Sequence, residues 1–221
     1  MEIQKKITEI KKSIPENVTL VAVSKTKPIS DLQAAYDGGQ RIFGENKIQE
    51  MVDKFDALPK DIQWHMIGHL QSNKVKYMAH FVDLIHGIDK FKTLKEINKQ
   101  AKKHDRIIHC LLQARIAKEE TKFGLSFEDI ESILQSSELV ALENVKIVGL
   151  MGMATFTENE AQLKEEFTSL KNFFDVQKLK TATKNCNLET LSMGMSGDYS
   201  LAIANGSSMI RVGSSIFGNR N

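Results

Sequence analysis

Short apolar runs recur along the chain and alternate with amphipathic segments. The first run, Leu20–Val23, is uninterrupted, which is typical of a strand buried on both faces within a parallel sheet. Before it, Ile3, Ile7, Ile10 and Ile14 follow one another at helical spacing, so they share one face of a predicted amphipathic helix. The pattern predicts a chain in which strands and helices take turns.

The same pattern extends over the whole chain, with Gly or Pro at many of the boundaries. The predicted strands are Thr19–Val23, Arg41–Phe43, Gln63–Ile67, Phe81–His86, Arg106–Ala114, Val145–Leu150, Leu188–Leu191 and Met209–Val212. The predicted helices are Glu2–Ile14, Ser30–Asp37, Lys47–Leu58, Gln71–His80, Lys90–Lys103, Ser126–Ser136, Glu158–Lys180 and Gly197–Ala204.

Alternation of this kind implies a parallel sheet with right-handed crossover connections. Eight predicted strands in 221 residues favour an α/β fold of one domain over residues 1–221, a single closed (β/α)₈ TIM barrel. An open, doubly wound sheet is the alternative. Its dinucleotide-binding version is weakened because no Gly-x-Gly-x-x-Gly motif follows the first strand.

Composition and charge narrow the classes of partner. A formal net charge of only +2 creates no strong field for nucleic acid. Cys110 and Cys186 lie far apart with no Cys-x-x-Cys motif, as expected of free cysteines in a reducing compartment. No apolar segment is long enough to cross a membrane, and the N-terminus lacks the apolar core of a signal peptide. We therefore expect a cytoplasmic protein without nucleic-acid or membrane partners.

Lys25 follows the first buried strand, where the chain turns polar before Pro28. An amine with few water neighbours is eased toward its neutral form, and a neutral lysine can attack a carbonyl carbon to form a Schiff base. The other interpretation is a solvated surface lysine that happens to follow a strand. The position of Lys25 alone leaves both open.

The loops after strands seven and eight often hold a phosphate in this fold. Here the seventh strand leads into Ser192–Ser196, and the eighth into Gly213 and Ser214. Ser196 is predicted to begin a short helix, whose free N–H groups favour an anion, and Gly213 allows a close approach of the backbone. The alternative is that Ser196 only caps its helix and Gly213 only turns the chain.

A phosphate site and a strand-end lysine at one barrel mouth suggest a single ligand that touches both. Pyridoxal phosphate has an aldehyde for the lysine and a phosphate for the loops. Arg211 is expected to point inward and donate to the pyridine nitrogen, although it could pair with a carboxylate at the rim. Asn46 could bond the ring hydroxyl or cap the next helix, and Met193 could line the ligand or fill the core.

A metal site is not expected. His65 and His69 are four residues apart, but Gly68 lies between them, and neither His-Glu-x-x-His nor another metal-ligand spacing is present.

Six sequence blocks resemble the signatures of the pyridoxal phosphate homeostasis protein family. They are Val-Ala-Val-Ser-Lys-Thr-Lys-Pro (21–28), Phe-Gly-Glu-Asn (43–46), His-Met-Ile-Gly-His-Leu-Gln-Ser-Asn-Lys (65–74), Gly-Leu-Met-Gly-Met-Ala (149–154), Leu-Ser-Met-Gly-Met-Ser-Gly-Asp (191–198) and Ile-Arg-Val-Gly-Ser-Ser-Ile-Phe-Gly (210–218).

The resemblance implies a fold similar to the N-terminal barrel of alanine racemase, and pyridoxal phosphate held on Lys25 as an aldimine. It further implies that Arg211 faces the pyridine nitrogen, that Asn46 lies near the cofactor, and that phosphate is held by Ser196, Gly213 and Ser214. The chain departs from the family at His69, where many members carry Pro, at Ser214, where Thr is frequent, and at Gly197, a variable position.

Three functions follow as hypotheses. The first is a binding protein for vitamin B6 homeostasis that holds pyridoxal phosphate, supplies it to pyridoxal-phosphate-dependent apoenzymes and has no catalytic residues. The second is a small amino-acid racemase, and the third is a lysine-dependent aldolase. A barrel-type racemase needs a second acid/base from another domain. Because the sequence ends at Asn221, soon after the last barrel loop, we expect the binding protein, as a monomer.

Overall fold

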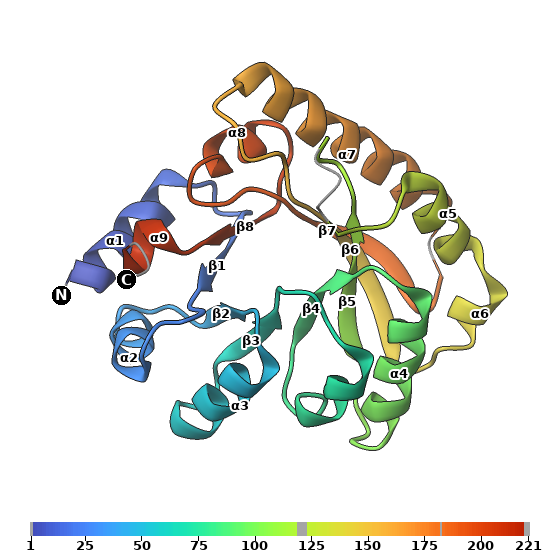
Figure 1. Ribbon diagram of the computed structural model, residues 1–221, viewed down its shortest axis with the longest axis horizontal. Helices are drawn as coiled ribbons and strands as arrows, with labels where there is room; N and C mark the ends of the chain where they lie inside the picture. Colours follow the sequence, from blue (N-terminus) through green and yellow to red (C-terminus); the bar gives the residue numbers. More distant parts are fainter. Residues whose placement is uncertain (1, 119–122, 182, 219–221) are drawn as a thin grey trace.

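The computed structural model describes residues 2–118, 123–181 and 183–218, and it shows a closed barrel of eight parallel strands in chain order, encircled by helices (Figure 1). The barrel closes where β8 pairs with β1, with Val21 beside Arg211. This confirms the predicted (β/α)₈ barrel. The strands are β1 (Thr19–Val23), β2 (Ile42–Glu45), β3 (Gln63–Met66), β4 (Leu84–Ile88), β5 (Ile108–Ala114), β6 (Val145–Gly152), β7 (Cys186–Ser192) and β8 (Met209–Val212).

Helices follow most strands and cover the outside of the barrel, while the first helix lies beside the last, near the two chain ends (Figure 1). In the described part of the chain, no helix combines the length and apolarity needed to cross a membrane. The helices are α1 (Glu2–Ser13), α2 (Ile29–Asp37), α3 (Ile48–Ala57), the 3₁₀ helix η1 (Ser72–Tyr77), α4 (Phe91–Lys102), α5 (Phe127–Gln135), α6 (Ser137–Val140), α7 (Glu160–Lys180), α8 (Tyr199–Ala204) and α9 (Ser214–Phe217).

The segment between β3 and β4 differs from its prediction. The helix expected over Gln71–His80 is the shorter 3₁₀ helix η1, and the strand expected over Phe81–His86 is β4, which lies further along at Leu84–Ile88. Gly87 was expected to end that strand but lies inside it. A Cβ at Gly87 would come within 2.5 Å of the carbonyl oxygen of Gly68. The glycine therefore permits a close approach of β4 to the loop after β3 instead of breaking the strand.

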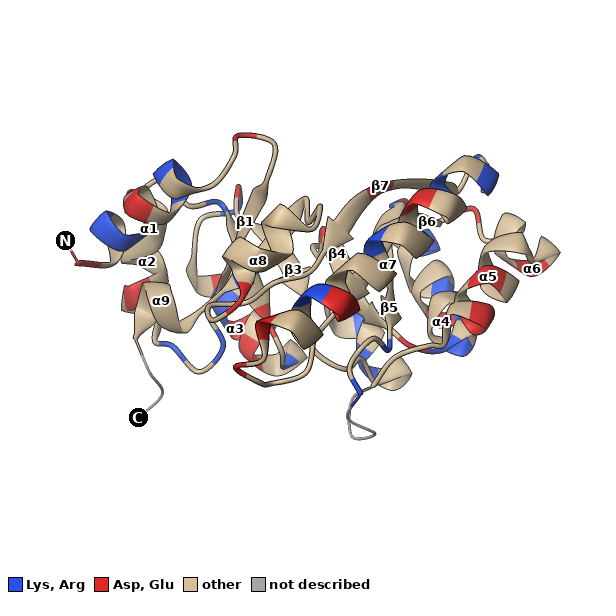
Figure 2. Cartoon of the chain, turned by 90° about the horizontal axis from the view of Figure 1, so that it is seen from above, with Lys and Arg blue, Asp and Glu red and all other residues tan. Residues whose placement is uncertain are grey.

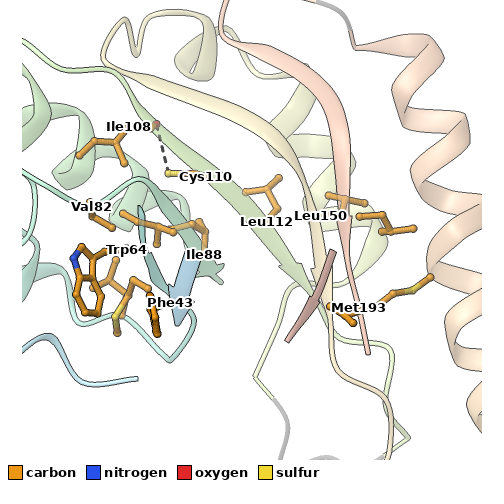
Figure 3. Close-up of a cluster of buried hydrophobic side chains, with 14 of the residues drawn as sticks. Phe43, Trp64, Val82, Ile88, Ile108, Cys110, Leu112, Leu150 and Met193 are labelled. Atoms are coloured by element: carbon orange, nitrogen blue, oxygen red, sulfur yellow. Dashed lines mark hydrogen bonds between the residues drawn. The ribbon is translucent and has the colours of Figure 1, made fainter. Parts of the chain in front are cut away.

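The core has two parts. The larger contains residues of both strands and helices, among them Phe43, Trp64 and Ile88, which lie together in Figure 3. The smaller comes from the strands alone and fills the barrel interior with Val21, Leu84, Leu111, Met151 and Met209. Lys, Arg, Asp and Glu lie on the outer helices and loops (Figure 2). Both cysteines are buried and free.

Candidate functional site

A cavity of about 1310 Å³ opens at the mouth formed by the carboxyl ends of the strands. Six of the seven residues predicted to bind the cofactor line it: Lys25, Asn46, Ser196, Arg211, Gly213 and Ser214. They come from the loops or ends of β1, β2, β7 and β8, so the barrel brings together positions far apart in the sequence. This is the mouth at which barrel proteins place their sites.

Met193 is the exception. Its side chain is fully buried in the hydrophobic core (Figure 3), and its N–H and C=O are bonded to the Met209 oxygen and the Ser207 hydroxyl. Met195, two residues further on, lines the cavity instead. The expectation that Met193 could line a ligand is wrong for its side chain, because the chain does not leave the barrel wall until after this residue.

Lys25 lies two residues after the end of β1 and is half-buried at the cavity wall. The strand reaches this point as predicted, and the N–H of Ser24 continues the pairing with β2 through the oxygen of Gly44 at 3.1 Å. The polar turn that follows is where Lys25 enters the cavity. An amine at this place is both accessible to a ligand and partly removed from water.

Ser196 faces the start of α9. Its Oγ accepts hydrogen bonds from the N–H groups of Gly213 at 3.1 Å and Ser215 at 3.5 Å. A Cβ on Gly213 would lie 3.2 Å from the oxygen of Val23, a tight approach that favours glycine. The two loops thus bring hydroxyl and N–H donors to one point, a donor set that suits an anion.

The predicted capping role of Ser196 is wrong. The short helix α8 begins at Tyr199, and Asp198 precedes it, although the Asp198 side chain does not cap the helix. Instead its Oδ1 accepts a hydrogen bond of 2.5 Å from the N–H of Met195 and closes the turn that contains Ser196. The hydroxyl of Ser196 is therefore available to the loop after β8.

Arg211 points into the barrel from β8 and is only 4% exposed. Its Nη1 donates to Ser192 Oγ at 2.6 Å, and its Nη2 donates to the oxygen of Gly152 at 3.0 Å. Among the described residues it forms no ion pair, so pairing with a rim carboxylate is not observed. Burial lowers the pKa of Arg211 to about 10, opposed by the negative charge of Asp198, and the guanidinium stays protonated at neutral pH.

A chain of hydrogen bonds continues from Ser192 into the barrel interior. Ser192 Oγ lies 3.2 Å from Nδ1 of His86, and Nε2 of His86 lies 3.1 Å from Nδ1 of His65. Burial lowers the pKa of His65 to about 3 and that of His86 well below its ordinary value. Both imidazoles are neutral.

Sequence reasoning considered His65 only as a metal ligand. No group of three His, Cys, Asp or Glu residues within the described ranges could hold a metal ion.

Asn46 is half-buried in the cavity wall and does not cap the following helix, whose N-cap is Lys47. A Cβ on Gly68 would meet the carbonyl oxygen of Asn46 at 2.7 Å. The loops after β2 and β3 are therefore packed closely here, which holds the Asn46 amide at the mouth.

The rim of the cavity includes an aromatic contact that sequence analysis did not predict. His69 stacks on Phe123 with ring centroids 4.7 Å apart, and its Nδ1 lies 3.1 Å from Asp89 Oδ2. Phe123 follows β5, in a segment of which residues 119–122 lie outside the described residues. His69, at one of the departures from the family pattern, thereby links three loops of the mouth.

A buried cluster behind Lys25 was also missed. Glu45, Glu50 and Lys54 meet where β2 packs against α3. Burial raises the pKa of Glu45, and the charge of Lys54 partly offsets this. The available signal was an acid two residues after the predicted strand Arg41–Phe43, followed by a Glu–Lys pair at helical i,i+4 spacing.

Comparison with known proteins gives consistent results. The profile of the family described as alanine racemase, N-terminal domain, matches residues 1–221. A pyridoxal phosphate homeostasis protein of Synechocystis sp. is 39% identical over 218 residues, which is 96% of each chain. PipY of Synechococcus elongatus is 33% identical and covers 98% of this chain and 100% of its own, with TM-scores of 0.91 without pyridoxal phosphate and 0.88 with it bound.

An alanine racemase of Clostridium difficile has a TM-score of 0.79 at 12% identity. The alignment covers 99% of this chain and 60% of the racemase, and at that identity it supports a shared fold alone.

Proposed function

We propose that this chain, which belongs to the pyridoxal phosphate homeostasis protein family, binds pyridoxal 5'-phosphate as an aldimine of Lys25 and acts in vitamin B6 homeostasis without robust catalysis. The observation that carries the proposal is the shared cavity. Lys25 lines this cavity together with Ser196, Gly213 and Ser214 of the loops after β7 and β8. The ligand bound to PipY has an aldehyde and a phosphate, and the lysine and these loops suit the two groups.

The phosphate has a matching set of donors. The N–H groups of Gly213 and Ser215 already point at a single oxygen, Ser196 Oγ, so an anion beside that hydroxyl would receive several hydrogen bonds. Ser214 is exposed at the cavity wall and adds its hydroxyl. The proposed phosphate-binding residues are Ser196, Gly213 and Ser214.

Arg211 is suited to face a pyridine nitrogen that carries no proton. Two of its N–H groups are held by uncharged acceptors, Ser192 Oγ and the Gly152 oxygen, and the residue also lines the cavity. A guanidinium only donates hydrogen bonds, so facing the pyridine nitrogen it would keep that nitrogen unprotonated. Asn46, on the loop after β2, is proposed to bond the ring hydroxyl.

This arrangement favours storage of the cofactor over turnover. Pyridoxal phosphate supplies an electron sink for carbanion chemistry when its ring nitrogen is protonated, and an arginine at that nitrogen weakens the sink. Held reversibly by Lys25, the cofactor can be passed to pyridoxal-phosphate-dependent apoenzymes. We propose these enzymes as the recipients.

Borohydride reduction followed by peptide mass mapping tests the proposal. After incubation with pyridoxal phosphate, reduction is expected to fix the label on Lys25. Lys25→Ala is expected to lose both the label and the visible absorbance while remaining folded. Lys27→Ala is the matched control, because Lys27 lines the same cavity and its removal leaves Lys25 in place. A label on Lys27, or an unlabelled wild-type protein, would refute the assignment of Lys25.

A further inference from the structure

Thr26, directly after Lys25, has a backbone φ of +65°. A β-branched residue is strained in this left-handed region, and such a conformation persists only where the surroundings over-determine it. Among the described non-glycine residues, Asp105 alone shares a positive φ. Something must therefore hold the turn that carries Lys25.

The Glu45–Glu50–Lys54 cluster, formed by those three side chains, supplies the restraint. The N–H of Thr26 donates to Glu50 Oε1 at 2.5 Å, and Lys54 Nζ donates to the carbonyl oxygen of Ser24 at 2.8 Å. One backbone group on each side of Lys25 is thus tied to the same cluster. The two ties fix the peptide planes from which the Lys25 side chain departs.

Lys54 uses its three donors fully. Besides the Ser24 oxygen, its Nζ donates to Glu45 Oε1 and to Glu50 Oε1, each at 2.7 Å. An ammonium group has three N–H donors, and the Lys54 residue is only 4% exposed. No contact can be released without leaving a buried donor unpaired, so the cluster behaves as one rigid unit.

Ser24 adds a further link. Its hydroxyl donates to Glu45 Oε1 at 2.6 Å, and both residues are fully buried. The cluster therefore joins the end of β1, the end of β2 and α3. Buried ion pairs are weak evidence for stability, whereas fixing the geometry of a strained turn at a site needs this kind of over-determined contact.

We propose that Glu50 and Lys54 are positioning residues that hold Thr26 in its left-handed conformation and so direct the Lys25 amine into the cavity. The inference rests on the proposed attachment of pyridoxal phosphate to Lys25. Without Glu50, Thr26 relaxes to a negative φ, the peptide between Lys25 and Thr26 rotates, and the amine no longer meets an aldehyde whose phosphate is held by the loops after β7 and β8.

The test is a titration of the full-length apoprotein with pyridoxal phosphate, followed by the visible absorbance of the bound cofactor. Glu50→Ala is expected to weaken binding by roughly tenfold or more, the scale that corresponds to one strained residue. Gln49→Ala is the matched control, because Gln49 is on the same helix and its amide bonds only the exposed Asp53. It should bind as the wild type does.

The decisive variant combines Glu50→Ala with Thr26→Gly. Glycine adopts positive φ without strain, so the double variant should recover much of the lost affinity. A loss caused merely by a weaker α3 would not be rescued by a change at Thr26. Failure of rescue in a folded double variant, or unchanged binding by Glu50→Ala, would overturn the inference.

A second readout separates this inference from the proposed function. In the apoprotein, reductive methylation with formaldehyde reports how readily each lysine reacts, without any phosphate contact. Glu50→Ala should change the rate at Lys25, and an unaltered rate would count against the inference. If Glu50→Ala does not fold, Glu50→Gln keeps an oxygen acceptor for the N–H of Thr26, so it should bind pyridoxal phosphate nearly as the wild type does, and a large loss of binding in this folded variant would overturn the inference. Retention of the borohydride-fixed label by Lys25→Ala would instead refute the proposed function.

Discussion

Ser192 accepts a hydrogen bond of 2.6 Å from Nη1 of Arg211, and its Oγ also lies 3.2 Å from Nδ1 of His86. Because a guanidinium can only donate, the Ser192 hydroxyl keeps its own proton for another acceptor. We predict that it donates this proton to Nδ1 of His86, so that His86 carries its proton on Nε2 and donates to Nδ1 of His65. In this order the inward arginine favours one tautomer of two imidazoles that it does not touch.

Histidine NMR tests this order. In protein labelled with ¹⁵N at histidine, both His65 and His86 are expected to be neutral with the proton on Nε2. Burial lowers their pKa values, that of His65 to about 3, so both signals should stay unchanged from neutral pH down to about pH 5. A proton on Nδ1 of either ring, or titration near its ordinary pKa, would contradict the direction of the chain.

The same two imidazoles predict a pH dependence of stability. Each is neutral in the folded protein but takes up a proton in the unfolded chain below about pH 6.5. Below that pH the unfolded state binds more protons than the folded state. The free energy of unfolding therefore falls by ~1.4 kcal/mol for each ring with every unit by which the pH decreases. The contribution is fully present above that pH, and for His65 the loss continues toward its folded pKa of about 3.

Urea unfolding at several pH values between about 7.5 and 5 measures this slope. His86→Asn removes one of the two titrating rings and should lower the slope by ~1.4 kcal/mol per pH unit. His104→Asn, at an exposed position, should leave it unaltered. Equal slopes in wild type and His86→Asn would show that His86 is protonated in the folded protein.

The strands were the most predictable part of the chain. Thr19–Val23 and Met209–Val212 coincide with β1 and β8, because short segments rich in apolar residues and bounded by polar loops or Gly leave little choice. The segment from η1 to β4 was misplaced, because Val75 and Val82 are buried outside any strand or α-helix. The apolar residues of this segment indicate which positions are buried, but their spacing does not indicate a helix or a strand.

The residues that line the cavity were predictable where they lie at or just after strand ends, as Lys25 does after β1 and Arg211 does near the end of β8. The contacts behind it were not. His65, His86 and Ser192 lie on three strands, and their hydrogen bonds depend on the register and closure of the barrel. Neither the register nor the closure of the barrel can be predicted from local sequence patterns. The left-handed conformation of Thr26 was equally hidden, since its N–H is bonded to a side chain 24 residues away.

Replacement of Arg211 tests its proposed place at the ring nitrogen. Arg211→Gln should retain attachment of pyridoxal phosphate to Lys25 but shift the visible absorbance and weaken binding, because the charged donor is lost. Ser192→Ala should cause a smaller change in the same direction, since it only loosens the guanidinium. Absorbance spectra and titrations measure both. Loss of folding in Arg211→Gln, seen by circular dichroism, would make the arginine structural, and an unchanged spectrum would place it away from the ring.

Gly149 is a test of the barrel wall itself. It pairs with Thr190 across β6 and β7, and a Cβ there would lie 1.8 Å from the Thr190 oxygen. Because the obstacle is backbone and not a movable side chain, Gly149→Ala must spread the two strands that lead into Gly152 and Ser192. We expect a loss of unfolding free energy of about 3 kcal/mol or more, at the upper end for overpacking.

Gly197→Ala is the matched control, because nothing lies within 4 Å of its Cβ; it should leave stability nearly unchanged. Urea unfolding of both variants measures the difference. Equal stabilities would mean that β6 and β7 can separate without cost. The spacing of these strands could then not be what sets the positions of Gly152 and Ser192, the two acceptors of Arg211.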